Sequence, residues 1–68
     1  MKLKSRLKRL RFEADQMSQG QLSKLTDIAV SQISDYQNDK IFPTAINLWI
    51  LAKALNREPG ELYEEVEE

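Results

Sequence analysis

Apolar residues recur at helical spacing along most of the chain. In residues 2–14 they stand at i, i+4, i+7 and i+11: Leu3, Leu7, Leu10 and Ala14. This spacing is typical of one face of an amphipathic helix that packs on a core. The residues between them are mostly basic or polar and would face solvent. We therefore expect a first helix over residues 2–14.

A second helix is expected over residues 18–25. The Ser18 hydroxyl can accept a hydrogen bond from a free amide of the first turn, and Gln21 occupies the reciprocal position of a capping box. Leu22 and Leu25, spaced i, i+3, would give this helix its inward face.

A tight turn and a third helix follow. Asp27 stands where the chain must turn, and Asp tolerates the left-handed backbone that such a turn requires. We expect the third helix over Ala29–Asn38. Ile33 and Tyr36 within it, together with Ile28 just before it, form a second apolar stripe. Two short helices joined by a tight turn form a helix-turn-helix unit, which here would span Ser18–Lys40.

The most apolar segment is a fourth helix, Ala45–Leu55, for which Thr44 is a suitable N-cap. Its inward stripe comprises Leu48, Leu51, Ala52 and Leu55. We expect Trp49 to widen this stripe and lie in the core. Asn56 can end the helix in a left-handed conformation, and a short last helix would run from Pro59 to Tyr63.

The fourth helix also carries apolar residues on a flank that a monomer would usually make polar. These residues are Ile46 and Ile50, joined by Ile41 and Phe42 from the preceding loop. An exposed apolar patch of this kind marks an association surface. We expect a homodimer interface here, with burial of the loop residues in the core as the alternative.

The 68 residues are enough for one domain, with a core of about residues 3–63 and an acidic tail over 64–68. We found no internal repeat and no strand-like alternation, so the fold class we expect is all-α: one compact domain of five helices.

Composition excludes several classes of function. The chain has no Cys and no His, which excludes disulfides, Cys/His metal sites and the usual nucleophile–base pairs of enzymes. No apolar run approaches the roughly 20 residues of a membrane span, and the basic N-terminus lacks the apolar core of roughly 7–15 residues that a signal peptide needs. We expect no enzyme activity, metal, cofactor, small-molecule ligand or membrane contact.

The net charge of −1 conceals an uneven distribution. Six of the ten basic residues lie in the first eleven positions, and five of the eleven acidic residues lie in the last eight. This asymmetry would give the domain one basic and one acidic face, or would simply reflect solvated helix surface and a frayed tail.

The order of all five segments resembles the phage Cro and lambda-repressor helix-turn-helix family. The resemblance covers roughly residues 3–63 and rests on Leu10-Arg11, Ser18-Gln19, Leu22, Ile28, Ser31, Ile33, Ser34, Tyr36, Asn38, Lys40, Pro43, Leu48, residues 51–55 and Glu61-Leu62-Tyr63. It implies a lambda-repressor-like fold with the helix-turn-helix at helices 2 and 3. The segment Ala54–Leu62 resembles the short stand-alone regulators of bacteria and their phages.

The resemblance also implies a DNA-binding surface. The positions that face base edges in the major groove are Val30, Ser31, Ser34 and Asp35. The positions on or near the DNA backbone are Ser18, Gln19, Gln32, Asn38 and Lys40, to which the charge distribution adds Arg6 and Arg11 of the first helix. Members of this family commonly dimerise around the fourth and fifth helices and the loop before the fourth, a region that includes Ile41, Phe42, Ile46 and Ile50.

Several residues depart from the family pattern. Asp27 replaces the usual Gly of the turn, and Ala29 replaces the usual Ser or Thr cap of the third helix. Gln37 stands where many members carry a Glu that pairs with the arginine of the first helix, here Arg11. The amide of Gln37 can still accept a hydrogen bond from that arginine.

Two hypotheses of function follow. The first is a bacterial or phage transcription regulator, a repressor that acts in the bacterial cytoplasm and binds a short palindromic operator in double-stranded DNA as a homodimer. The second is a protein-interaction module, similar to an antitoxin or an anti-repressor, that keeps the fold but binds a protein. It is favoured by the net charge and by the absence of Lys and Arg from Ile28 to Asp39.

Overall fold

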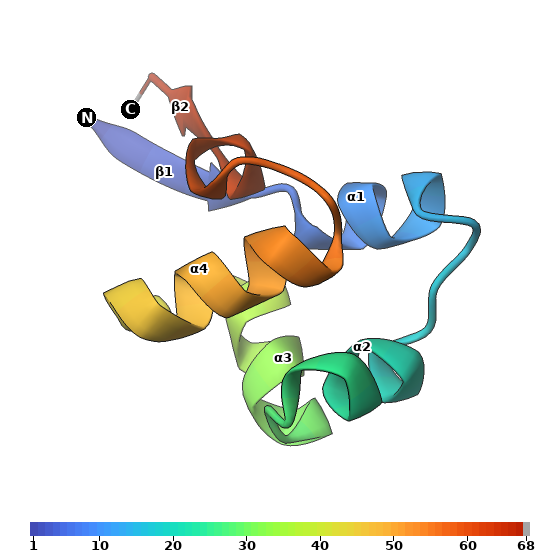
Figure 1. Cartoon of the computed structure of the whole chain (residues 1–68). Coiled ribbons are helices and arrows are strands. Elements are labelled where there is room, and N and C mark those ends of the chain that lie inside the picture. The colour runs from blue at the N-terminus through green and yellow to red at the C-terminus, as the bar shows by residue number, and fades with distance from the viewer. Residues whose placement is uncertain (68) are drawn as a thin grey trace.

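A computed structural model describes residues 1–67, in which four α-helices pack beside a two-stranded sheet (Figure 1). The elements in chain order are β1 (Lys2–Ser5), α1 (Leu7–Glu13), α2 (Gln19–Thr26), α3 (Val30–Gln37), α4 (Ala45–Ala54), the 3₁₀ helix η1 (Pro59–Leu62) and β2 (Tyr63–Val66). The helical segments match the sequence-based bounds to within two residues from α2 to α4.

The sheet corrects our expectation of an all-α, five-helix fold. Lys2–Ser5 pairs antiparallel with Tyr63–Val66, so that the two ends of the chain lie side by side. The register sets Lys4 opposite Glu64, and opposite charges on facing strand positions stabilise such a pair. Residues 64–66 are therefore part of a strand and not of the acidic tail that we expected, and Glu68 lies outside the described residues.

The first helix consequently begins later than its leucine spacing predicted. The Leu7 amide donates to the Ser5 hydroxyl at 3.1 Å, and the Arg6 amide donates to the Leu62 carbonyl at 2.8 Å. The second bond continues the strand pairing one residue past Ser5, so that α1 begins only after Arg6. Leu3 continues the helical periodicity in sequence but lies on β1, half-buried.

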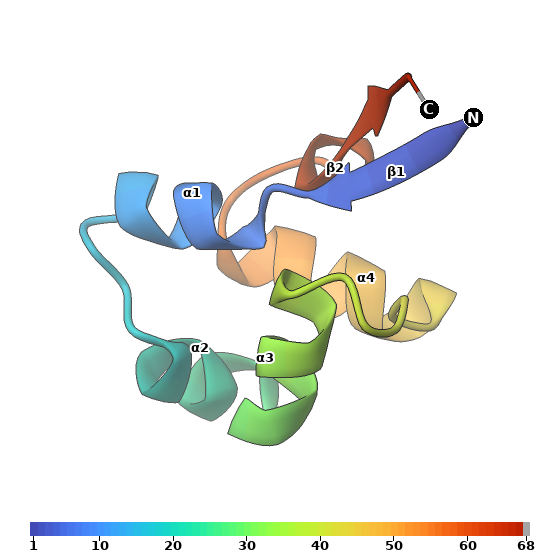
Figure 2. The same ribbon diagram turned by 180° about the vertical axis from the view of Figure 1, so that it is seen from behind.

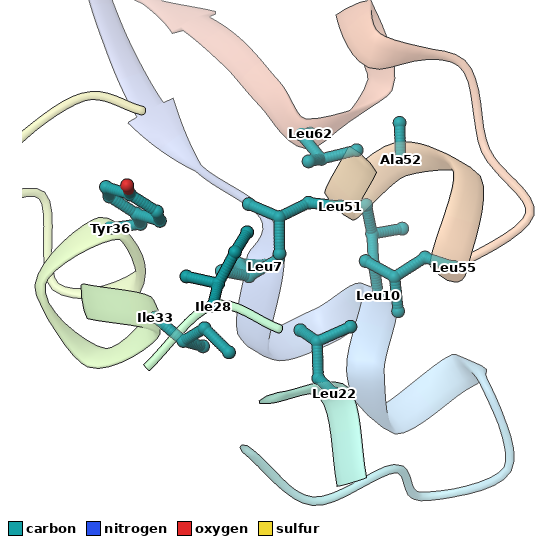
Figure 3. Packing of buried hydrophobic residues seen from close by; sticks show 10 residues of the cluster. All are labelled: Leu7, Leu10, Leu22, Ile28, Ile33, Tyr36, Leu51, Ala52, Leu55 and Leu62. Atoms are coloured by element: carbon teal, nitrogen blue, oxygen red, sulfur yellow. The ribbon is translucent and has the colours of Figure 1, made fainter. Parts of the chain in front are cut away.

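The core is formed by side chains from all four helices, from η1 and from the turn before α3 (Figure 3). It comprises Leu7, Leu10, Leu22, Ile28, Ile33, Tyr36, Leu51, Ala52, Leu55 and Leu62. Burying an aliphatic side chain of this size contributes about 1.5–3 kcal/mol to folding. The stripes that we expected on α1, α3 and α4 are confirmed in these positions.

Two apolar residues that we expected in the core lie at the surface. Leu25 is 63 % exposed because the inward line of α2 runs from Leu22 to Thr26. The Thr26 hydroxyl can be buried there since it donates to the Leu22 carbonyl at 2.8 Å and accepts from the Ile28 amide at 3.2 Å. Trp49 is 65 % exposed on the outer side of α4.

The local signals for helix ends are confirmed. The Thr44 hydroxyl accepts from the Asn47 amide at 3.1 Å, Asn56 has a φ of 58°, and Pro59 opens η1. None of the helices formed by residues 1–67 has the length and apolar character needed to cross a membrane.

The two leucines of α2 provide a matched test of this packing. We expect Leu22→Ala to lower the free energy of unfolding by about 2–5 kcal/mol, since it opens a cavity in the core. Leu25→Ala should change it by no more than about 0.5 kcal/mol, because its side chain lies in solvent. Urea denaturation followed by circular dichroism measures both, and equal losses would show that the packing of α2 is wrong.

Candidate nucleic-acid interface

The helix-turn-helix is built by the local chemistry that the sequence predicts. The Gln21 amide donates to the Ser18 hydroxyl at 3.0 Å, and the Ser18 amide donates to the Gln21 side-chain oxygen at 2.8 Å, which completes the capping box at the start of α2. Asp27 ends the helix in the left-handed region with a φ of 60°. Across the turn, the Ser23 hydroxyl donates to the Ile28 carbonyl at 2.6 Å.

The N-terminal end of α3 lies on the side of the molecule remote from the sheet, as the two opposite views show (Figures 1 and 2). No side chain caps this end, because Ala29 has no hydroxyl to accept from the first turn. Val30 is 45 % exposed and Ser31 is exposed, whereas Ser34 and Asp35 are half-buried. The four residues expected to face bases thus lie on one helix, with the first two the most accessible.

The expected backbone contacts fall into separate groups. Ser18 and Gln19 lie at the start of α2, while Asn38 and Lys40 lie just beyond the end of α3, where the Asn38 side chain donates to the Ser34 hydroxyl at 3.3 Å. Gln32 is exposed on α3 itself.

Arg11 joins α1 to α3 and to the loop before α2. Its Nε and Nη2 atoms donate to the Gln37 side-chain oxygen at 3.1 and 2.6 Å, and its Nη1 atom donates to the Met17 carbonyl at 2.8 Å. The link between Arg11 and Gln37 that we expected is therefore confirmed. The Gln19 side chain donates to the same Gln37 oxygen at 3.4 Å, a contact that sequence spacing did not indicate.

Partial burial lowers the pKa of the Arg11 guanidinium from its ordinary value. The group nevertheless stays charged near neutral pH, because a free guanidinium titrates only above about pH 12. Arg11 and Ser18 line the same open groove of about 590 Å³ on the outer side of α1. The guanidinium thus remains accessible from solvent beside the start of α2.

Two other arginines of the basic N-terminal segment already have carboxylate partners, which the sequence did not indicate. An Arg6 terminal nitrogen lies 3.7 Å from a Glu64 oxygen, and Arg9 forms an ion pair with Glu13 at 3.0 Å. Arg6 and Arg9 line the same groove as Arg11, but each has a carboxylate partner there.

An apolar patch lies on a different part of the surface, over the loop before α4 and α4 itself. Ile41 is 46 % exposed, Phe42 63 % and Ile46 73 %. Ile50, which we grouped with them, is half-buried and packs against the core. Trp49, three residues after Ile46 on the same helix, is exposed where we expected Ile50 to be. The i, i+3 spacing of Ile46 and Trp49 could have indicated that both lie on the same face of α4.

The patch also contacts the sheet. The rings of Phe42 and Tyr63 are 5.4 Å apart and tilted by 47°, within the range that favours aromatic pairs. Across residues 1–67 there is no group of three or more metal-ligating side chains suited to a metal ion.

Comparison with known proteins gives the family. A family model described as helix-turn-helix, HTH_3, matches residues 7–62, which extend from the start of α1 to the end of η1. A search of curated proteins found no match to the chain. The matched family consists of DNA-binding regulatory domains and is not a family of enzymes, which indicates a DNA-binding transcription regulator. Residues 7–62 make up most of the chain, and the protein therefore belongs to the Cro/C1-type helix-turn-helix family.

Proposed function

We propose that the protein is a repressor that binds a short palindromic DNA operator as a homodimer and acts in the bacterial cytoplasm. The observation that supports this proposal most directly is the exposed N-terminal end of α3, in a chain that matches the helix-turn-helix family. Binding of this kind occupies promoter DNA, and repression is the simplest result of such occupancy.

The side chains on α3 can read bases in the major groove. The Val30 methyl groups suit contact with a thymine methyl, the Ser31 hydroxyl can donate or accept, and the Asp35 carboxylate can accept from a cytosine amino group. Ser34 lies beside them. The described part of α3 has no Arg or Lys that could bond a guanine in the bidentate manner.

The DNA backbone would be held by groups around the start of α2 and the end of α3. Free amides and the positive end of the helix dipole favour a phosphate near Ser18 and Gln19. Arg11, Gln32, Asn38 and Lys40 would add contacts on either side. Arg6 would contribute only after exchanging its Glu64 partner for a phosphate.

A second copy of the chain would cover the patch formed by Ile41, Phe42, Ile46 and Trp49. Dimerisation would remove exposed apolar surface from water and would double the number of phosphate contacts. Because α3 has no basic residue, each monomer on its own would hold DNA weakly. The two α3 helices would then read two related half-sites.

The alternative function, a module that binds a protein in place of DNA, is favoured by one observation. Among the described residues, Arg6, Arg9 and Arg57 form ion pairs with carboxylates, and α3 has no basic residue that could bind phosphate in their place. A gel-shift assay against a pool of random duplexes distinguishes the two functions. We expect binding at 50 mM salt that weakens by at least about tenfold at 200 mM, because phosphate contacts release counterions. Absence of binding at 50 mM would favour the alternative.

Substitutions on α3 should alter base preference without unfolding the protein. Ser31→Arg would place a guanidinium at the groove and should add about 1–3 kcal/mol of preference for guanine at one operator position. Val30→Ala should relax the preference for thymine. Phe12→Arg adds the same charge as Ser31→Arg on an exposed site of α1 and should leave the preference unchanged. Site selection with each variant gives the preferences, and identical selected sites for all would show that α3 does not read bases.

A charge in the apolar patch should separate the dimer. Ile46→Asp puts a carboxylate at a position that is 73 % exposed in the monomer, so we expect the monomer to fold while the dimer dissociates. Leu25→Asp is the control, because Leu25 is a comparably exposed apolar residue on α2. Sedimentation equilibrium measures the mass of each variant. A dimer that survives Ile46→Asp would place the interface elsewhere.

A further inference from the structure

The side-chain oxygen of Gln37 on α3 accepts hydrogen bonds from residues of both α1 and α2. This one atom accepts hydrogen bonds from Arg11 Nε, Arg11 Nη2 and Gln19 Nε2, at 3.1, 2.6 and 3.4 Å. An amide oxygen has two lone pairs, so these three donors share it. Gln37 thereby fixes two side chains from different helices relative to each other.

Arg11 differs from the other arginines of the described chain in the charge of its partners. Arg6, Arg9 and Arg57 each lie within 4.0 Å of a carboxylate. The acceptors around Arg11 are neutral: the Gln37 amide oxygen and the Met17 carbonyl. Its positive charge is therefore oriented by its neighbours without being cancelled by them.

Arg11 also keeps unused donors. A guanidinium has five N–H groups, and the three bonds described above take one each from Nε, Nη1 and Nη2. One N–H group remains on each terminal nitrogen. The bond to Met17 holds these nitrogens next to Ser18, where the N-terminal dipole of α2 also favours an anion.

We propose that Gln37 is a positioning residue for the DNA backbone: it holds Arg11 and Gln19 at the start of α2 and, because it is neutral, leaves the Arg11 charge free for a phosphate. This inference rests on the proposed DNA-binding function. A carboxylate at position 37 would hold Arg11 equally well, but the resulting ion pair would cancel the charge that the phosphate requires. Side-chain neutrality at this position compensates in part for the absence of basic residues on α3.

Gln37→Glu tests the proposal, since the two side chains have nearly the same shape. We expect the variant to fold and its melting temperature to be unchanged or higher, because the carboxylate can accept the same bonds. Binding to a duplex selected by the wild-type protein should weaken by about tenfold at 150 mM salt. The slope of log Kobs against log salt concentration should become less steep by about 0.9 for each bound half-site.

Asn56→Asp is the matched control. It makes the same change from amide to carboxylate just beyond the end of α4, at a left-handed position that Asp tolerates. We expect it to leave the salt slope unchanged. A purely structural role for Gln37 predicts no change in slope for Gln37→Glu either.

Each outcome has a distinct meaning. If the wild-type protein binds and Gln37→Glu keeps both its affinity and its slope, the role of Gln37 is wrong while the proposed function stands. If Gln37→Glu fails to fold, the proposal is also contradicted, because the carboxylate should satisfy Arg11. Failure of the wild-type protein to bind any duplex would contradict the proposed function itself.

Discussion

The burial of Leu22 and Ile33 is the constraint on which the helix-turn-helix depends. Both side chains have no exposed surface, and each anchors one helix of the unit to the shared core. A chain of 68 residues has a small core, so the loss of either contact would remove a large part of its stability. The angle between α2 and α3, and hence the position of every exposed group at the proposed DNA surface, follows from this packing.

Electrostatics at this surface depends on local pairing more than on net charge. The N-terminal segment is rich in basic residues, but Arg6 and Arg9 have carboxylate partners while Arg11 has neutral ones. A protein with a net charge of −1 can therefore still present positive charge where a phosphate would approach. The β-sheet contributes to this arrangement, because Glu64 on β2 is the residue that pairs with Arg6.

Signals that act within one or two turns of the chain were predicted well. The capping box of Ser18 and Gln21, the left-handed turn at Asp27 and the Thr44 cap depend on neighbours a few residues away, and all are confirmed. The sheet could not be found in this way, because β1 acquires its partner from residues about sixty positions later. The helical spacing of Leu3 with Leu7 concealed it further.

The same distinction applies to the surface. The exposure of Val30 and Ser31 agrees with their expected place on α3, but spacing alone did not separate Leu22 from Leu25, because both fit an inward stripe. Thr26 takes the second inward position of α2 in place of Leu25, because its hydroxyl bonds to the Leu22 carbonyl and to the Ile28 amide. The three-way contact at Gln37 likewise depends on how α1, α2 and α3 meet, which no local pattern encodes.

Selection of bound sites from a random library of DNA duplexes would show whether two copies of α3 read DNA sequence together. We expect enrichment of a palindrome whose half-sites are centred about one helical turn, roughly 10 base pairs, apart. A library that shows no enrichment after repeated rounds at low salt would contradict this expectation.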